Sequence, residues 1–283
     1  MPHLFCFGLG YSALILAKQL LLEGWRVSGT CRTSDKCERL RAMGITAYIF
    51  DNDLPLQEVW DLGGVTHILH SAPPASSPQP LDPVLHHHLA DLKSLPNLEW
   101  FGYLSTTGVY GDHNGAWVSE ETPVNPPHGR NQRRADAEEA WLDCGLPVHI
   151  FRLSGIYGKG RSAIDELKAG KAHRVHKEGQ VFSRIHVEDI AGILRGSINK
   201  PNPWRVYNCA DDEPAPQAQV VEYAAKLLGI TPPPLVEFEQ AELSEMAKSF
   251  WASNRRVSNE RIKQELGVQL KYPTYREGLK SCL

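Results

Sequence analysis

The sequence has little that points to nucleic acid, to membranes or to secretion. Among 283 residues, 30 are Lys or Arg and 33 are Asp or Glu, which gives a net charge of −3 and no basic excess for binding nucleic acid. No run approaches the roughly 20 apolar residues that a membrane-spanning helix needs. The first residues, MPHLFCFGLG, are apolar but lack a basic flank, which predicts a buried strand and not a signal peptide. We therefore expect a cytoplasmic protein without nucleic-acid or membrane partners.

Cysteine is also scarce. The six cysteines are scattered, none forms a CxxC pair, and their spacings suggest neither a zinc site nor a disulfide framework. The sequence does hold three consecutive histidines, His86, His87 and His88. Consecutive side chains on a helix point in different directions, so these three do not converge on one ion. The sequence predicts a reducing environment and no metal site.

Strand and helix patterns alternate through the first half of the chain. A helix is expected over 12–24, and another over 34–44 with Ser34 as its cap and Gly44 as its stop. This alternation predicts a doubly wound parallel sheet of the Rossmann type, an α/β fold. We expect a dinucleotide-binding domain over 1–160 and a smaller mixed cap over 161–283, with the strand 205–210 returning to the main sheet. The other expected strands of the sheet are 3–8, 25–32, 45–50, 66–72, 98–105 and 146–154.

The stretch GLGYSA, residues 8–13, has the form GxGxxA between a predicted strand and a predicted helix. Gly8 would make the tight turn, and Gly10 would let the backbone approach a pyrophosphate. Ala13 is small enough for close packing of helix on strand. A helix N-terminus that faces this turn favours an anion. The turn predicts a dinucleotide site, with candidate contacts from Gly8, Gly10, Tyr11 and Ser12.

The second predicted strand ends in GTCRTS, where an NAD site usually has a carboxylate for the ribose. Arg32 stands there instead, and a guanidinium can hold a 2′-phosphate, assisted by Ser34 and Lys36. We therefore favour NADP(H) over NAD(H); the alternative is a surface arginine. Asp51, at the end of the third strand, is a candidate partner for the adenine amine or else a turn residue. Further candidate cofactor contacts are Ser71 and Ala72.

Several motifs in order resemble those of the extended short-chain dehydrogenases/reductases, the epimerase–dehydratase group. The opening GLGYSA differs from the usual GxxGxxG of that group and resembles an atypical branch that includes the bacterial YeeZ-like proteins. The resemblance implies a nicotinamide cofactor and a small-molecule substrate held between the nucleotide domain and the cap. The motifs are LSTTGVYGD (104–112), EETPVNPP (120–127), FRLSGIYGKGR (151–161), FSRIHVEDIAGIL (182–194), VYNCADDEP (206–214) and RRVSNERIKQELG (255–267).

The resemblance also assigns site residues. Thr106 falls where the family's Ser or Thr orients the substrate oxygen. Leu153 and Ser154 match positions whose backbone lies near the nicotinamide. The family then uses a tyrosine as acid/base and a lysine four residues later, a cation that makes the phenol a useful base.

That Tyr–Lys pair is absent from HGRNQRRADAEEAW, residues 128–141. One register puts His128 and Gln132 in the two slots; the other, which we prefer because it keeps the helical spacing to Glu138, puts Arg130 and Arg134 there. Arg134 would bind the nicotinamide ribose or a phosphate. Arg130 stays protonated, so it would hold an anionic substrate or polarise a carbonyl. His128 is a candidate for proton transfer. The alternative is a solvated first turn of a helix.

The sequence supports three functions. The first is an NADP(H)-dependent oxidoreductase that transfers hydride to or from an unidentified small molecule. The second is a non-enzymatic NADP(H)-binding redox sensor or regulatory protein, which the missing Tyr–Lys pair suggests. The third is an epimerase or dehydratase that uses the nicotinamide transiently. By the resemblance, a homodimer is possible through the helices near 81–95 and 131–143.

Overall fold

The computed structural model describes residues 1–50, 54–56, 63–75 and 81–283. Asp51 therefore lies outside the described residues. The chain divides into two compact units that interleave along the sequence. The first unit comprises residues 1–106, 127–152 and 191–207. The second unit comprises residues 107–126, 153–190 and 208–283.

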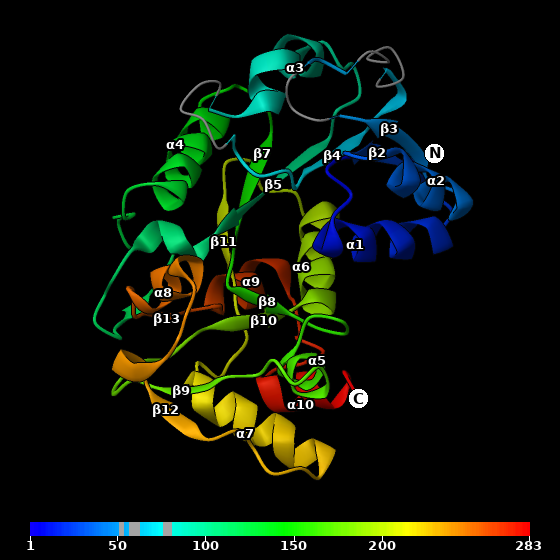
Figure 1. Ribbon diagram of the computed structural model, residues 1–283. Helices are drawn as coiled ribbons and strands as arrows, with labels where there is room; N and C mark the ends of the chain where they lie inside the picture. Colours follow the sequence, from blue (N-terminus) through cyan, green and yellow to red (C-terminus); the bar gives the residue numbers. More distant parts are fainter. Residues whose placement is uncertain (51–53, 57–62, 76–80) are drawn as a thin grey trace. The chain divides into compact units, whose positions relative to one another are not determined.

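A seven-stranded sheet runs through the described residues with β1 near its middle (Figure 1). Strands β1, β2, β3, β4 and β5 pair in parallel with their neighbours. The chain moves outward from β1 in both directions, so the predicted doubly wound sheet is confirmed. In sheet order the strands are β3 (Thr46–Ile49), β2 (Arg26–Cys31), β1 (His3–Phe7), β4 (His67–His70), β5 (Trp100–Thr106), β7 (Val148–Leu153) and β11 (Val206–Cys209).

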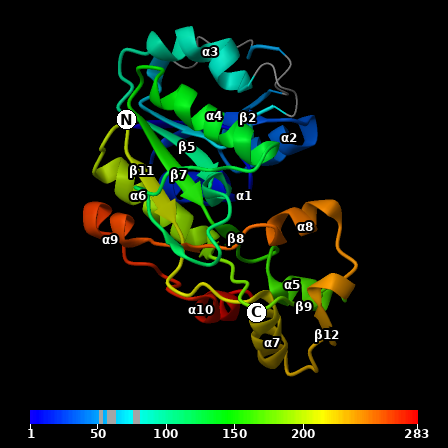
Figure 2. The same ribbon diagram turned by 90° about the vertical axis from the view of Figure 1, so that its left-hand side faces the viewer.

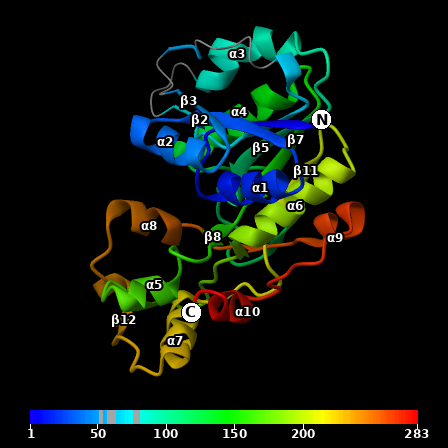
Figure 3. The ribbon, with the colours of Figure 1, turned by 90° about the vertical axis from the view of Figure 1, so that its right-hand side faces the viewer.

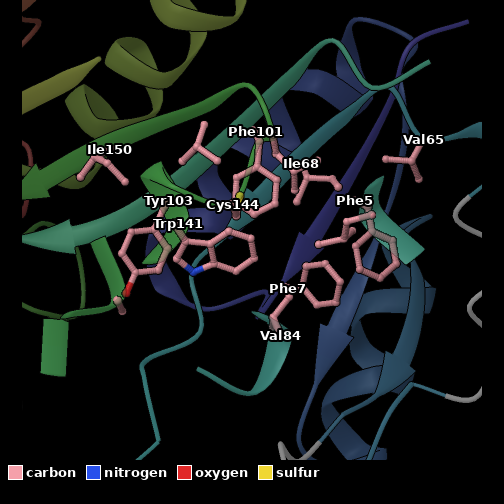
Figure 4. Packing of buried hydrophobic residues seen from close by; sticks show 14 of the residues in the cluster. Phe5, Phe7, Val65, Ile68, Val84, Phe101, Tyr103, Trp141, Cys144 and Ile150 are labelled. Carbon is pink, nitrogen blue, oxygen red and sulfur yellow. The ribbon is translucent and has the colours of Figure 1, made fainter. Parts of the chain in front are cut away.

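Helices cover both faces of this sheet, as its largely buried inner strands require. Helices α3 and α4 lie over one face (Figure 2), and α1, α2 and α6 lie over the other (Figure 3). Alternate strand residues such as Phe5, Phe7, Phe101 and Tyr103 belong to an apolar core under α3 and α4, and the rings of Phe101 and Tyr103 lie beside Trp141 of α4 (Figure 4). The helices are α1 (Tyr11–Leu22), α2 (Ser34–Ala42), α3 (Pro83–Lys93), α4 (Arg130–Leu142) and α6 (Val187–Asn199).

The second unit is built from short elements. Its two-stranded sheets are β8 with β10, β9 with β12, and β6 with β13. A separate apolar cluster joins α5, α7 and α10 around Ile164, Ala224 and Leu279. The element bounds are η2 (Thr107–Tyr110), β6 (Trp117–Val118), β8 (Gly155–Tyr157), α5 (Ala163–Lys168), β9 (Arg174–His176), β10 (Arg184–His186), α7 (Gln217–Leu228), β12 (Leu235–Glu237), η3 (Phe238–Gln240), α8 (Glu245–Trp251), β13 (Arg256–Val257), α9 (Glu260–Leu266) and α10 (Tyr275–Lys280).

One local expectation is wrong. Ser34 is the first residue of α2, and Thr33 precedes it in extended backbone as the cap position, without a side-chain cap bond. Gly44 ends the α2 segment as predicted, with a left-handed φ of 83° that favours glycine. The predicted domain boundary after residue 160 stays a prediction. In the described part of the chain, no helix combines the length and apolar character needed to cross a membrane.

Candidate cofactor site and the carboxyl end of β5

The glycine turn between β1 and α1 is tightly built at Gly8. Its φ is +87°, and an added Cβ would lie 3.0 Å from the backbone nitrogen of Ala72 and 3.3 Å from Ser71 Oγ. The Ser71 hydroxyl donates to the Gly8 carbonyl, and the Gly8 amide donates to Thr30 Oγ1 over 2.8 Å. Only glycine fits this position. The structure thus brings Gly8, Ser71 and Ala72 together, as expected for one site.

Gly10 is different, because neither its backbone nor its neighbours require a glycine. It is extended, with φ −85° and ψ −165°, and it caps α1 without any side-chain cap bond. Among the described residues, an added Cβ at Gly10 would meet no atom within 4 Å. Tyr11 and Ser12 form the first turn of α1, which contains no acidic residue. The backbone at Gly10 and the start of α1 are open to an anion.

Three cations gather where β2 meets α2. Arg32 is exposed in the connecting loop, and Lys36 and Arg39 lie on α2. Burial lowers the pKa of Lys36, and the positive charges of Arg32 and Arg39 lower it further. Among the residues that the structure describes, none of the three cations forms an ion pair. This concentration of positive charge suits a phosphate.

The same loop contains a feature that sequence reasoning missed. A disulfide joins Cys31, at the end of β2, to Cys37 on α2, with Cα atoms 6.1 Å apart. The two cysteines are six residues apart in the sequence. The short cysteine motifs considered above, such as CxxC, do not include this spacing, so the pairing was not predicted. The remaining cysteines, Cys6, Cys144, Cys209 and Cys282, are buried free thiols.

The structure separates the candidates on and before α4. His128 and Arg130 are exposed, whereas Arg134 is partly buried. The Arg134 Nη1 donates to the Leu104 carbonyl over 3.0 Å and to the Tyr103 hydroxyl over 2.9 Å. Arg134 therefore reaches the carboxyl end of β5, where Thr106 is the last strand residue. The alternative stated above, a solvated residue in the first turn of a helix, therefore does not describe Arg134.

A buried ionic cluster holds the next turn of α4. Glu138 is 3% exposed and accepts from Arg152 Nη2 over 2.7 Å and from Arg152 Nε over 3.0 Å. The Ser105 hydroxyl also donates to Glu138. In the sequence, Glu138 served only to align residues 128–138 with the family motif. Its contacts with Arg152 and Ser105 were not predicted. The available signal was the Arg134–Glu138 spacing of four residues, which puts both side chains on one face of the helix.

Two tyrosines of the family motifs after β5 and β7 are held by structural contacts. Tyr110 is fully buried and donates to Asn208 Oδ1 over 2.8 Å. Burial raises the pKa of Tyr157 far above its usual range, so it stays protonated at neutral pH. Leu153 and Ser154 belong to the second unit, where the Ser154 amide donates to the Cys209 carbonyl over 3.0 Å. Their contact with a nicotinamide stays a prediction.

The three histidines of the run 86–88 differ in burial. His86 is exposed and His88 is buried, where its Nε2 accepts from the Leu56 amide over 2.9 Å. The three rings therefore lie in different surroundings. No group of three or more His, Cys, Asp or Glu side chains able to hold a metal occurs in the described part of the chain.

Comparisons with known proteins agree with this architecture. The chain is 31% identical over 282 residues to protein YeeZ of Escherichia coli K12, covering 94% of each chain. A solved structure of a functionally unknown conserved protein from Silicibacter pomeroyi is 46% identical, with a TM-score of 0.90 over 100% of this chain and 98% of that one. A dTDP-glucose 4,6-dehydratase from Bacillus anthracis, solved with NAD, is 20% identical with a TM-score of 0.80 over 100% and 95% of the two chains. No family model matches the chain.

The identity to YeeZ extends over nearly the whole length of both chains. The Bacillus anthracis enzyme shares the fold at low identity, as the ordered motifs after β5 and β7 led us to expect. The chain therefore belongs to the YeeZ family.

Proposed function

We propose that this protein binds NADP(H) at the β1–α1 turn and acts as an oxidoreductase on a small molecule. The open backbone at Gly10 is the observation that carries the proposal. A glycine that neither φ nor neighbouring atoms require is explained by a ligand that must approach the backbone closely. The pyrophosphate of a dinucleotide is such a ligand, and the start of α1 faces it.

The preference for NADP(H) rests on the cations of the β2–α2 loop. Arg32, Lys36 and Arg39 lie close enough that their charges depress the pKa of Lys36. Holding them together is unfavourable unless an anion compensates. A 2′-phosphate would supply that anion, and the Arg32 guanidinium can bind it through two hydrogen bonds. The NAD bound to the Bacillus anthracis dehydratase lacks this group.

The proposed reaction uses residues around the carboxyl end of β5. When bound, the nicotinamide supplies or accepts a hydride. Thr106 would orient the substrate oxygen. Arg134 is anchored by Leu104 and Tyr103 and stays protonated, so it would hold the nicotinamide ribose or an anionic group. Arg130 would hold an anionic substrate, and His128 or water would carry the proton that the family's tyrosine carries elsewhere.

A second function has its own support. In the register that we prefer, the Tyr and Lys slots hold Arg130 and Arg134, and Arg134 is tied to the main chain of β5. Such a protein would bind NADP(H) as a redox sensor or regulator without turnover. A sensor would bind NADPH and NADP⁺ with very different affinities and would oxidise no NADPH with any carbonyl compound. An epimerase or dehydratase would also consume no net NADPH, but product analysis would reveal its activity.

Calorimetric titration of the cofactor-stripped protein tests the proposal. We expect NADPH and NADP⁺ to bind with similar affinity and NADH to bind at least tenfold more weakly. Arg32→Gln should remove most of that difference by weakening NADPH binding alone. Arg26→Gln, an exposed residue at the other end of β2, is the matched control and should change nothing. Absence of NADPH and NADH binding at millimolar concentration would refute the proposal.

A further inference from the structure

The Cys31–Cys37 disulfide encloses the loop that carries the proposed phosphate-binding residues. Cys31 ends β2 and Cys37 lies in the first part of α2. The five residues between them include Arg32, Ser34 and Lys36. A bond between the two sulfurs therefore fixes the end of the strand to the start of the helix around this loop.

The surroundings of this pair favour thiol chemistry more than those of the other cysteines. Cys37 lies near the N-terminus of a nine-residue helix, and Lys36 and Arg39 flank it in the sequence. A helix N-terminus and nearby cations both stabilise a thiolate. By contrast, burial raises the pKa of Cys6 well above its usual range, and burial together with the charge of Glu120 raises that of Cys209.

Formation of the bond must also change the loop. Bonded sulfurs lie about 2.0 Å apart, whereas the sulfur atoms of two free thiols must lie at least a van der Waals contact distance apart. Cys31 and Cys37 are almost fully buried, so the sulfurs cannot separate without moving the first turn of α2 or the end of β2. Lys36 and Arg32 are attached to those two segments and repel one another. Release of the bond lets the cations move apart.

We propose that Cys31 and Cys37 form a reversible dithiol–disulfide site that controls the affinity for the 2′-phosphate of NADP(H). This inference rests on the proposed function. The oxidised form holds Arg32 and Lys36 together and binds NADPH more tightly, because the loop is ordered before the ligand arrives. A disulfide that forms reversibly agrees with a reducing compartment, where protein disulfides are mostly transient and redox-sensing.

The exchange step needs a low-molecular-weight disulfide such as oxidised glutathione. The thiolate of one cysteine attacks a glutathione sulfur, forms a mixed disulfide and releases one glutathione thiolate. The second cysteine, as its thiolate, attacks the protein sulfur of that mixed disulfide and releases the second glutathione. Two protein thiols are oxidised, one glutathione disulfide is reduced to two thiols, and the two thiol protons end on the glutathione molecules.

The experiment compares the full chain after reduction with a phosphine and after oxidation with glutathione disulfide. Intact mass and peptide mapping identify the bond, and calorimetry measures NADPH and NADH binding in each state. We expect a 31–37 cross-link, roughly fivefold tighter NADPH binding in the oxidised form, and unchanged NADH binding. Cys37→Ser should bind NADPH like the reduced wild type in both conditions. Cys144→Ser, a buried free thiol of the first unit, should respond like the wild type.

Three results would overturn the inference. The first is absence of a 31–37 cross-link after oxidation. The second is equal NADPH affinity in both states of a cross-linked protein, which leaves the proposed function intact. The third is an equal change for NADH and NADPH, because control would then not act through the 2′-phosphate. Failure of both nucleotides to bind in either state, with the cross-link present, refutes the proposed function itself.

Discussion

At the scale of single residues, the two glycines of the β1–α1 turn exist for different reasons. Gly8 has a left-handed φ and touches Ala72, so the fold itself requires glycine there. Gly10 is extended and faces open space, so the fold tolerates a side chain. Substitution at these two positions should therefore separate a structural role from a ligand-binding role.

Gly10→Ala should weaken NADPH binding at least tenfold, because the new methyl group would occupy the path of the pyrophosphate. The free energy of unfolding should fall by no more than about 1 kcal/mol, the usual effect of alanine at a helix cap. Gly8→Ala, in contrast, should destabilise the protein by roughly 1–2 kcal/mol from the left-handed backbone alone. Calorimetry and urea unfolding measure the two effects. Wild-type NADPH affinity in Gly10→Ala would show that this turn is not the pyrophosphate site.

At the scale of secondary-structure elements, α4 is anchored to the sheet by polar contacts as well as by its apolar face. Arg134 bonds to β5, and Glu138 bonds to Arg152 of β7 and Ser105 of β5. Glu138 and Arg152 are both buried, so each needs the other to offset its desolvation. These contacts hold the helix that carries Arg130 and Arg134 at a fixed position along the strands.

Glu138→Ala should lower the free energy of unfolding by about 3 kcal/mol, because it leaves the Arg152 guanidinium buried without its carboxylate. The neighbouring Glu139 is exposed, so Glu139→Ala is the matched control and should change stability by less than about 0.5 kcal/mol. Urea denaturation of the two variants provides the comparison. Equal stability of both variants would mean that the cluster contributes nothing to holding α4.

At the scale of the whole molecule, two buried histidines link stability to pH, one in each unit. Burial lowers the pKa of His149 to about 4 and that of His186 to about 4. The ring of His149 lies 3.2 Å from the Phe101 carbonyl and accepts from the Asn202 amide over 2.9 Å, an arrangement that suits the neutral imidazole. The unfolded chain takes up protons near pH 6.5, whereas the folded chain does so only near pH 4.

Stability should therefore be unaffected by these histidines above about pH 7 and should fall as the pH drops from 6.5 toward 4. Each group should account for about 2 kcal/mol between pH 7 and pH 4.5. Urea titrations across this range measure the loss of unfolding free energy. In His149→Gln, that loss should be smaller by the contribution of one histidine. An equal loss of stability in the wild type and in His149→Gln would contradict a neutral His149 ring, because other groups, such as Asp211 with its pKa raised by burial to about 8, contribute equally to both proteins.

The sequence by itself determined the order of the elements, the doubly wound sheet and the glycine turn. Those features depend on short-range patterns: the alternation of strand and helix patterns, helix stops such as Gly44, and the spacing of Gly8 and Gly10. The family resemblance also came from local motifs. The cap of α2 was wrong by one residue, because Thr33 and Ser34 both suit a cap and only the backbone distinguishes them.

Only the tertiary structure decided which candidate side chains can act together. Nothing local indicates that Arg134 bonds to Leu104, 30 residues earlier in the chain, or that Glu138 meets Arg152 and Ser105. The burial of Tyr110 and Tyr157, two tyrosines of the family motifs, also depends on contacts that the sequence alone does not show. Such contacts join segments far apart in the sequence, and the packing of helices on the sheet sets them. The same packing places Cys31 against Cys37, a pairing that their spacing alone does not require.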